Sequence, residues 1–308
     1  MNWDFETAER LLQLCTEHGL SIGDVALRRE IARSNESEAT LLARMAGHYR
    51  VMRESIRRGL ASNTRSATGL SGGDAVRLLD YARGPGPLLG GQVATVAAYG
   101  FAVLEHNAQF GRIVATPTAG SAGIVPACLL TLEESRGLDE AGAARALFSA
   151  AGVGAVIGQR APFSGAQGGC QAEVGSAAAM AAAAVAEAEG GTPEQALNAA
   201  AFALMNTLGM VCDPIGGYVE VPCVSRNGMF AVHACLAATL SLAGVRCVVP
   251  FDEVVLAMRD IGRRMPRALR ETAQAGLATT PTGLRHPPQA VVPQPASPAR
   301  GRNAGEPP

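Results

Sequence analysis

The chain has 308 residues, a net charge of −1 and a sequence pI of about 6.5, so its charge gives no reason to expect nucleic acid or an anionic membrane as a partner. Its hydrophobic content is 48% but its aromatic content only 4%, and a core of Ala, Leu and Val favours close-packed helices over a sheet sandwich. All 26 basic residues are arginine, and without a lysine the chain cannot form the Schiff base of a pyridoxal phosphate (PLP) enzyme.

The first 60 residues form the N-terminal helical part of the predicted fold. Ser21 and Ser37 are each followed by apolar residues at helical spacing, as expected for helix N-caps. The N-terminus has no basic segment followed by an apolar one, so we expect no secretory signal. Seven scattered cysteines fit a reducing compartment better than a disulfide framework, and we expect the cytoplasm.

Further helices are predicted over residues 92–110, 139–158, 192–209 and 252–264, with an alanine-rich helix after residue 175 and another to about residue 243. The apolar run 139–158 carries Arg145, which argues against a membrane span. The strand-like run 245–249 is too short for a sheet. We therefore predict an all-α fold of about ten helices in one catalytic domain, residues 1–284, with glycine-rich loops around one site. Residues 285–308 are rich in Pro, Ala and Arg and are predicted to be a disordered tail.

Two glycine-rich loops interrupt these helices, residues 66–74 and residues 116–123. Either loop could be an ordinary connection or could line a pocket, because loops often carry function. The second loop runs into an apolar helix from Ile124, and the backbone N–H groups at a helix start can bind a carboxylate.

The seven cysteines fall into two groups. Four lie among Leu, Ala and Val, as core residues do: Cys15, Cys128, Cys235 and Cys247. Cys170, Cys212 and Cys223 lie beside Gly or Pro on predicted loops with polar neighbours. A metal or cluster site, a nucleophilic cysteine and chance all remain open for these three, since their spacing matches neither a zinc finger nor a compact ferredoxin.

Longer motifs around the same three cysteines resemble a known family. Residues 164–175 (SGAQGGCQAEVG), 212–214 (CDP) and 220–223 (EVPC) are similar to the signature of the alpha subunit of iron–sulfur-dependent L-serine dehydratase. Residues 71–74 (SGGD), 117–123 (PTAGSAG) and 280–283 (TPTG) extend the resemblance, which covers roughly residues 5–284.

This resemblance implies a lyase that needs no PLP and converts L-serine to pyruvate and ammonia, in amino-acid degradation and gluconeogenesis. It implies a [4Fe–4S] cluster held by Cys170, Cys212 and Cys223, with one iron lacking a protein ligand. A separate beta subunit would complete the active site, and a dimer of heterodimers is one assembly that fits. No role with nucleic acid or membrane is expected. The α-proton base stays unassigned.

We expect the substrate carboxylate to bind at a small set of hydroxyl and glycine residues, and polar side chains to line the pocket around it. The carboxylate set is Thr118, Gly120 and Ser121, with Ser164 close by, and the lining set is Asn107, Arg112 and Asn227.

The chain departs from the family pattern at Gln167, where the family usually has Glu, and at residues 160–163, where small polar residues are usual. A neutral amide cannot accept a proton, so the sequence leaves open whether Gln167 lowers activity. Three other functions stay open: a related L-cysteine desulfidase, a non-catalytic iron–sulfur sensor, and a metal-free helical scaffold.

Overall fold

The computed structural model describes residues 2–286, which form twelve α-helices and several short helical turns with no strand among them. The predicted all-α class is therefore confirmed. Of the predicted disordered tail, Arg285 lies in a 3₁₀ turn (Gly283–Arg285) and His286 follows it, while residues 287–308 lie outside the described part.

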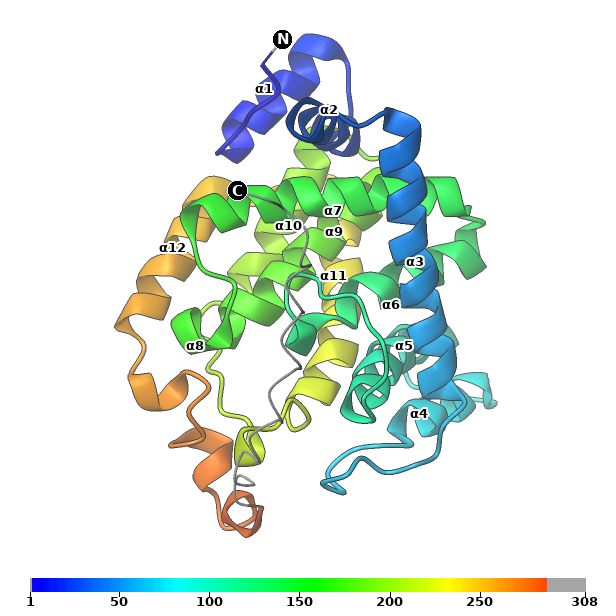
Figure 1. Cartoon of the computed structure of the whole chain (residues 1–308), viewed down its shortest axis with the longest axis vertical. Helices are drawn as coiled ribbons and strands as arrows, with labels where there is room; N and C mark the ends of the chain where they lie inside the picture. The colour runs from blue at the N-terminus through cyan, green and yellow to red at the C-terminus, as the bar shows by residue number, and fades with distance from the viewer. Residues whose placement is uncertain (1, 287–308) are drawn as a thin grey trace, which may run out of the picture.

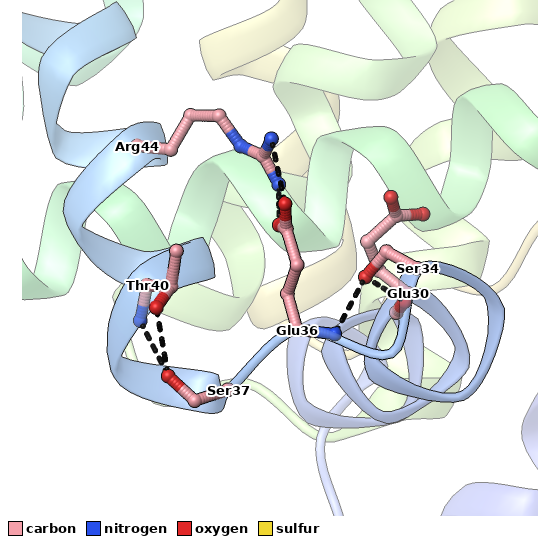
Figure 2. A network of polar contacts seen from close by, with 6 residues as sticks. All are labelled: Glu30, Ser34, Glu36, Ser37, Thr40 and Arg44. Carbon is pink, nitrogen blue, oxygen red and sulfur yellow. Dashed lines mark hydrogen bonds and ion pairs between the residues drawn. The ribbon is translucent and has the colours of Figure 1, made fainter.

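The N-terminal part forms three helices, as predicted: α1 (Ala8–His18), α2 (Ile22–Ser34) and α3 (Glu38–Leu60). Each begins at a hydroxyl residue whose side chain accepts a backbone N–H of the first turn. Figure 2 shows this cap at α3, where Ser37 Oγ accepts from the Thr40 N–H at 3.1 Å. Glu36 pairs with Arg44 beside the cap.

The centre of the molecule is α9 (Ser176–Ala188), in which every residue from 176 to 186 is buried. Its alanines let neighbouring helices approach closely. Packed against it are α6 (Ile124–Arg136), α7 (Glu140–Arg160), α10 (Pro193–Met205) and α11 (Cys223–Leu242). In Figure 1, α7 crosses above this group and α3 runs down one side. The core therefore surrounds the helix that follows Cys170.

The remaining helices are α4 (Asp74–Arg83), α5 (Gly91–Ala108), α8 (Gly165–Gly168) and α12 (Phe251–Arg264). Among the described residues, α7 alone is long and apolar enough to cross a membrane, and 67% of its apolar window is buried inside the bundle, as in a core helix. The predicted helix to Gly209 is too long. It ends at Met205 with Asn206 as its C-cap, and Gly209, with a φ of +85°, lies in the turn that follows.

Three helices begin against carboxylates that come from distant parts of the chain. Glu105 of α5 accepts the first N–H groups of α4 at 2.8 to 3.4 Å. Glu187 of α9 accepts those of α2 at 2.8 and 3.0 Å, and Asp252 of α12 accepts those of α1 at 3.0 Å. Burial raises the pKa of Glu105 and of Glu187 above its ordinary value. Tertiary packing therefore stabilises these helix starts.

Candidate functional site

Three cysteines from separate parts of the chain meet in the interior. Cys170, Cys212 and Cys223 are 1%, 3% and 5% exposed, the first two thiols share a hydrogen bond, and Cys223 is near enough to raise the pKa of Cys212. Only Cys212 lies on an extended segment, where its N–H donates to Leu269 O at 2.9 Å. The predicted loop position is wrong for Cys170 and Cys223. Each instead lies at the start of a helix. Cys223 is the first residue of α11, and Cys170 caps a π-helical turn that continues into α9.

Arg226 is the cation of this group. It lies one turn after Cys223, donates from Nη1 to Val211 O at 3.0 Å and hydrogen-bonds the Cys170 thiol. The hydrogen bond from Cys212 lowers the pKa of Cys170, and the positive charge of Arg226 lowers it further, although burial alone would raise it. The hydrogen bond with Cys170 and burial raise the pKa of Cys212, and burial and the Cys170 charge raise that of Cys223. At Cys223, burial therefore raises the thiol pKa by more than the helix N-terminus lowers it.

The loop of residues 116–123 brings three of the predicted substrate residues together. The Thr118 and Ser121 hydroxyls are 3.1 Å apart, and the Ser121 hydroxyl donates to Thr116 O at 3.1 Å. Thr118 Oγ1 also donates to Glu173, a carboxylate three residues after Cys170. A Cβ at Gly120 would lie 2.8 Å from Glu173 Oε1, so glycine allows this close approach. Burial raises the pKa of Glu173.

Asn227 joins this loop to the cysteine helix. It is fully buried, and its Nδ2 donates to Gly120 O at 2.7 Å and to Cys223 O at 2.8 Å. Its Oδ1 accepts the Gly123 N–H at 2.8 Å, so that N–H at the start of α6 is not available to an anion. Asn227 is thus a structural link, while Arg112 is exposed and Asn107 is half-buried near the end of α5.

Ser164 precedes the short helix α8, and Gln167 lies within it. The Ser164 carbonyl accepts the Gln167 N–H at 3.1 Å, and the next residue, Gly165, packs on Cys212, whose Sγ would lie 2.7 Å from an added Cβ. Ser164 is therefore adjacent to the cysteine group. Gln167 is exposed, and only its backbone oxygen has a nearby donor, Arg270 Nη1 at 3.4 Å. It is not one of the buried polar groups around the cysteines.

The other glycine-rich loop, residues 66–74, is tied to the segment that leads to Cys223. Glu220 is 5% exposed and accepts hydrogen bonds from the hydroxyls of Ser66, Thr68 and Ser71, the second at 2.7 Å. The loop therefore contacts the segment before Cys223, and a role in lining a pocket stays a prediction.

Sequence reasoning missed four charged residues of this region: Glu173, Glu220, Arg226 and Glu271. The first three lie within four residues of a predicted ligand cysteine, so proximity along the chain was a usable signal. Glu271 had no such signal. It reaches the site because its N–H donates to Cys212 O at 2.7 Å, although the two residues are far apart in the sequence.

Three thiolates are a donor set that an iron–sulfur cluster takes. Within residues 2–286, no group of three or more His, Cys, Asp or Glu side chains is placed to hold a single metal ion. A four-iron cluster binds each thiolate at a separate iron, so its ligands stand further apart. Three buried polar atoms in the adjoining segments have no partner, namely Thr116 Oγ1, Ser176 Oγ and Arg270 Nε, and a bound polar group would satisfy such atoms.

Comparison with known proteins gives consistent matches along this chain. A family model described as serine dehydratase alpha chain matches residues 17–278. The chain is 46% identical over 279 residues to a probable L-serine dehydratase alpha chain of Bacillus subtilis, covering 91% of this chain and 93% of that one. It is 43% identical to the L-serine dehydratase alpha chain of Peptoniphilus asaccharolyticus, covering 91% and 96%. It is also 40% identical to the L-serine dehydratase of Streptomyces coelicolor, covering 90% of this chain but only 61% of that longer protein.

Proposed function

This chain belongs to the serine dehydratase alpha chain family, and from that premise we propose that it deaminates L-serine to pyruvate and ammonia with a [4Fe–4S] cluster held by Cys170, Cys212 and Cys223. The observation that carries the proposal is the meeting of three buried cysteines beside a loop of hydroxyls and glycine. The absence of lysine closes the PLP route, so the activity is assigned to a PLP-independent lyase.

When bound, the cluster supplies a Lewis-acidic iron that makes the serine hydroxyl a better leaving group. Arg226 provides a buried positive charge beside the thiolates, which offsets part of their negative charge. The Thr118 and Ser121 hydroxyls lie 3.1 Å apart and donate to Glu173 and to Thr116 O, and both would turn to a bound carboxylate. Gly120 lets the Glu173 carboxylate lie against this loop. The substrate carboxylate is therefore assigned to this loop, with Ser164 on the Cys212 side.

Glu173 is our candidate for the group that accepts the α-proton. It lies between the hydroxyl loop and Cys170, and its hydrogen bond from Thr118 holds the carboxylate toward that loop. Burial moves its pKa upward, nearer the range that suits a general base at neutral pH. The proton passes from Cα to Glu173, and the C–H electron pair forms the Cα=Cβ double bond as the Cβ–O bond breaks. The leaving hydroxide then takes up the proton from Glu173, so that water is released and the carboxylate is restored. The resulting aminoacrylate tautomerises to the imine, which hydrolyses to pyruvate and ammonia.

The same proposal includes a partner and a setting. A separate beta chain is expected because the two relatives of matching length are named alpha chains. All seven cysteines are free thiols, which supports a reducing compartment such as the cytoplasm.

Anaerobic co-purification with the cognate beta chain tests this function. Iron per chain, visible absorption and pyruvate release are measured together, with L-serine, L-cysteine and L-threonine as substrates, before and after exposure to air. We expect a coloured protein that prefers L-serine and loses both colour and activity in air. A colourless, iron-free protein with full activity would rule out the cluster, and a preference for L-cysteine would indicate a desulfidase.

A further inference from the structure

Four large apolar side chains are exposed along the pair of helices α5 and α11. Leu88 and Leu89, just before α5, are 87% and 74% exposed, and Met229 and Leu236 of α11 are 68% and 55% exposed. The two helices pack against each other, with Gly228 of α11 lying against the Phe101 ring of α5 (Figure 1). We call the surface formed by these four side chains and the groove described next the α5/α11 face.

A groove of about 500 Å³ runs between the exposed leucines of the two helices. Its lining is mainly apolar and includes Leu89, Val93, Val96, Val232, Leu236 and Leu242. One end is closed by the ion pair between Arg136 and Glu189, whose Nε and Oε2 are 3.3 Å apart. Exposed apolar area that continues into a groove is typical of a protein interaction surface.

Apart from the Arg136–Glu189 pair in the groove, the α5/α11 face lacks the charges that a solvated helix carries. No Asp, Glu or Arg occurs over residues 91–104 of α5 or over residues 227–242 of α11. The solvated helix α3, by contrast, has charged residues at positions 44, 50, 53, 54, 57 and 58. A surface helix normally alternates an apolar stripe with a polar face, so the uncharged outer face of α5 and α11 is suited to contact with protein.

This face is continuous with the cysteine region. The helix α11 begins at Cys223, and Asn227 on its second turn bonds both Cys223 and the hydroxyl loop. A protein seated on the outer side of α11 would therefore contact the same helix that carries a proposed cluster ligand, two residues beyond Asn227 at Met229.

We propose that the α5/α11 face is the docking surface for the beta chain. The inference rests on the proposed function for the existence of that chain. The length of the relatives points to this occupant: the match covers 61% of the Streptomyces coelicolor L-serine dehydratase and 62% of those of Escherichia coli and Helicobacter pylori, so each contains a further part that lies outside the match. In a two-chain enzyme that part belongs to a second polypeptide, and the large uncharged surface beside the site is where its apolar face would be buried.

Two single substitutions and a matched control test the docking surface in the co-expressed complex. Leu236→Glu and Leu89→Glu each place a charge in the groove, whereas Val248→Glu changes an apolar residue that is 94% exposed and outside the groove. Burying an unpaired charge is costly, so we expect both groove variants to weaken beta-chain binding at least about tenfold, with Val248→Glu unchanged. Titration of labelled beta chain and the mass of the complex by light scattering give the readout.

Two outcomes would overturn the proposal. One is wild-type affinity for the beta chain in both groove variants. The other is normal beta-chain binding with loss of alpha-chain self-association, which would assign the face to a second copy of this chain. Circular dichroism shows whether each variant is folded, and a misfolded one is replaced by Met229→Glu. Iron content is measured separately, so an iron-free protein that still binds the beta chain would contradict the proposed function and leave the docking surface standing.

Discussion

The start of α3 and the segment before Cys223 use the same polar chemistry in opposite surroundings. At α3, Glu36 and Arg44 pair with side chains 36% and 51% exposed, near the Ser37 cap (Figure 2). Before Cys223, Glu220 collects three hydroxyls while only 5% exposed. Water can replace the partners at α3 but not those of Glu220. Exposed polar contacts therefore stabilise only a local helix start, whereas buried ones hold distant segments of the site together.

The largest effect is expected at a proposed cluster ligand. Cys212→Ser replaces the thiolate with a poor iron ligand, so iron content and visible absorption should fall to background. Lyase activity should fall by more than about 100-fold, the upper range for changes beyond the direct ligands. Cys247→Ser, at a half-buried cysteine outside the site, is the control and should keep its iron. Full iron retention in Cys212→Ser would contradict the ligand assignment.

The next effect concerns proton transfer. Glu173→Gln keeps the shape of the side chain but removes its basic oxygen, so kcat should fall by about 10² to 10⁴-fold while iron content stays constant. Steady-state kinetics with L-serine gives the measurement. Gln167→Glu is the matched control: it restores the usual family residue at an exposed position and should leave kcat unchanged. A gain of activity from Gln167→Glu, with little loss from Glu173→Gln, would move the base to position 167.

The free energy of unfolding should distinguish the buried Glu220 from the exposed Glu36. Glu220→Ala leaves three hydroxyls in a buried environment without their acceptor and should lower the free energy of unfolding by about 2–4 kcal/mol. Urea unfolding followed by circular dichroism measures the loss. If Glu220→Ala costs less than about 0.5 kcal/mol, burial is not what distinguishes the two regions.

A pH effect should follow from the buried carboxylate Glu187. Its pKa in the folded protein is above the ordinary value because of burial, so between the two values the folded state holds a proton that the unfolded chain has released. Its contribution to stability is therefore greatest below the ordinary carboxylate pKa and is lost as pH rises through the folded pKa. Urea midpoints of wild type and Glu187→Gln should diverge in favour of wild type as pH is lowered from neutral. If the difference between the two urea midpoints stays constant with pH, Glu187 is not the source of the pH dependence.

The smallest effect is expected at the exposed pair. Arg44→Ala removes the ion pair with Glu36 and should change the free energy of unfolding by less than about 0.5 kcal/mol, because exposed pairs exchange freely with water and are screened by salt. The same urea experiment as for Glu220→Ala provides a direct comparison. If Arg44→Ala lowers the free energy of unfolding as much as Glu220→Ala does, the exposed ion pair contributes as much stability as the buried hydrogen bonds and the comparison fails.

Local patterns predicted local structure well. The caps at Ser21 and Ser37 were expected from the sequence, and each side chain accepts a backbone N–H three residues later. The helix predicted from residue 192 begins in the same way, with a full capping box at Thr192. The reason is physical: a cap involves residues only three positions apart, so the sequence window contains both partners. The same applies to the alanine-rich helix α9, whose composition alone requires close neighbours.

Contacts across the chain were not predictable in this way. The sequence singled out Cys170, Cys212 and Thr118 but not Glu173 as the carboxylate between them, nor the strand-like pairing of Cys212 with Arg270. It also placed Cys170 and Cys223 on loops, because Gly and Pro beside them suggested breaks, whereas those breaks mark the positions where helices begin. Which residues meet depends on how twelve helices pack, and a single sequence does not contain that arrangement.

The carboxylates that receive the starts of α1, α2 and α4 have a consequence for any attempt to divide the molecule. Removing residues 1–60 as a separate module would leave Glu187 and Asp252 facing emptied positions where backbone donors had been. The separated residues 1–60 would likewise lose the carboxylates that accept the first N–H groups of α1 and α2. Both fragments would lose these hydrogen bonds, so cutting the chain near residue 60 should destabilise each of them.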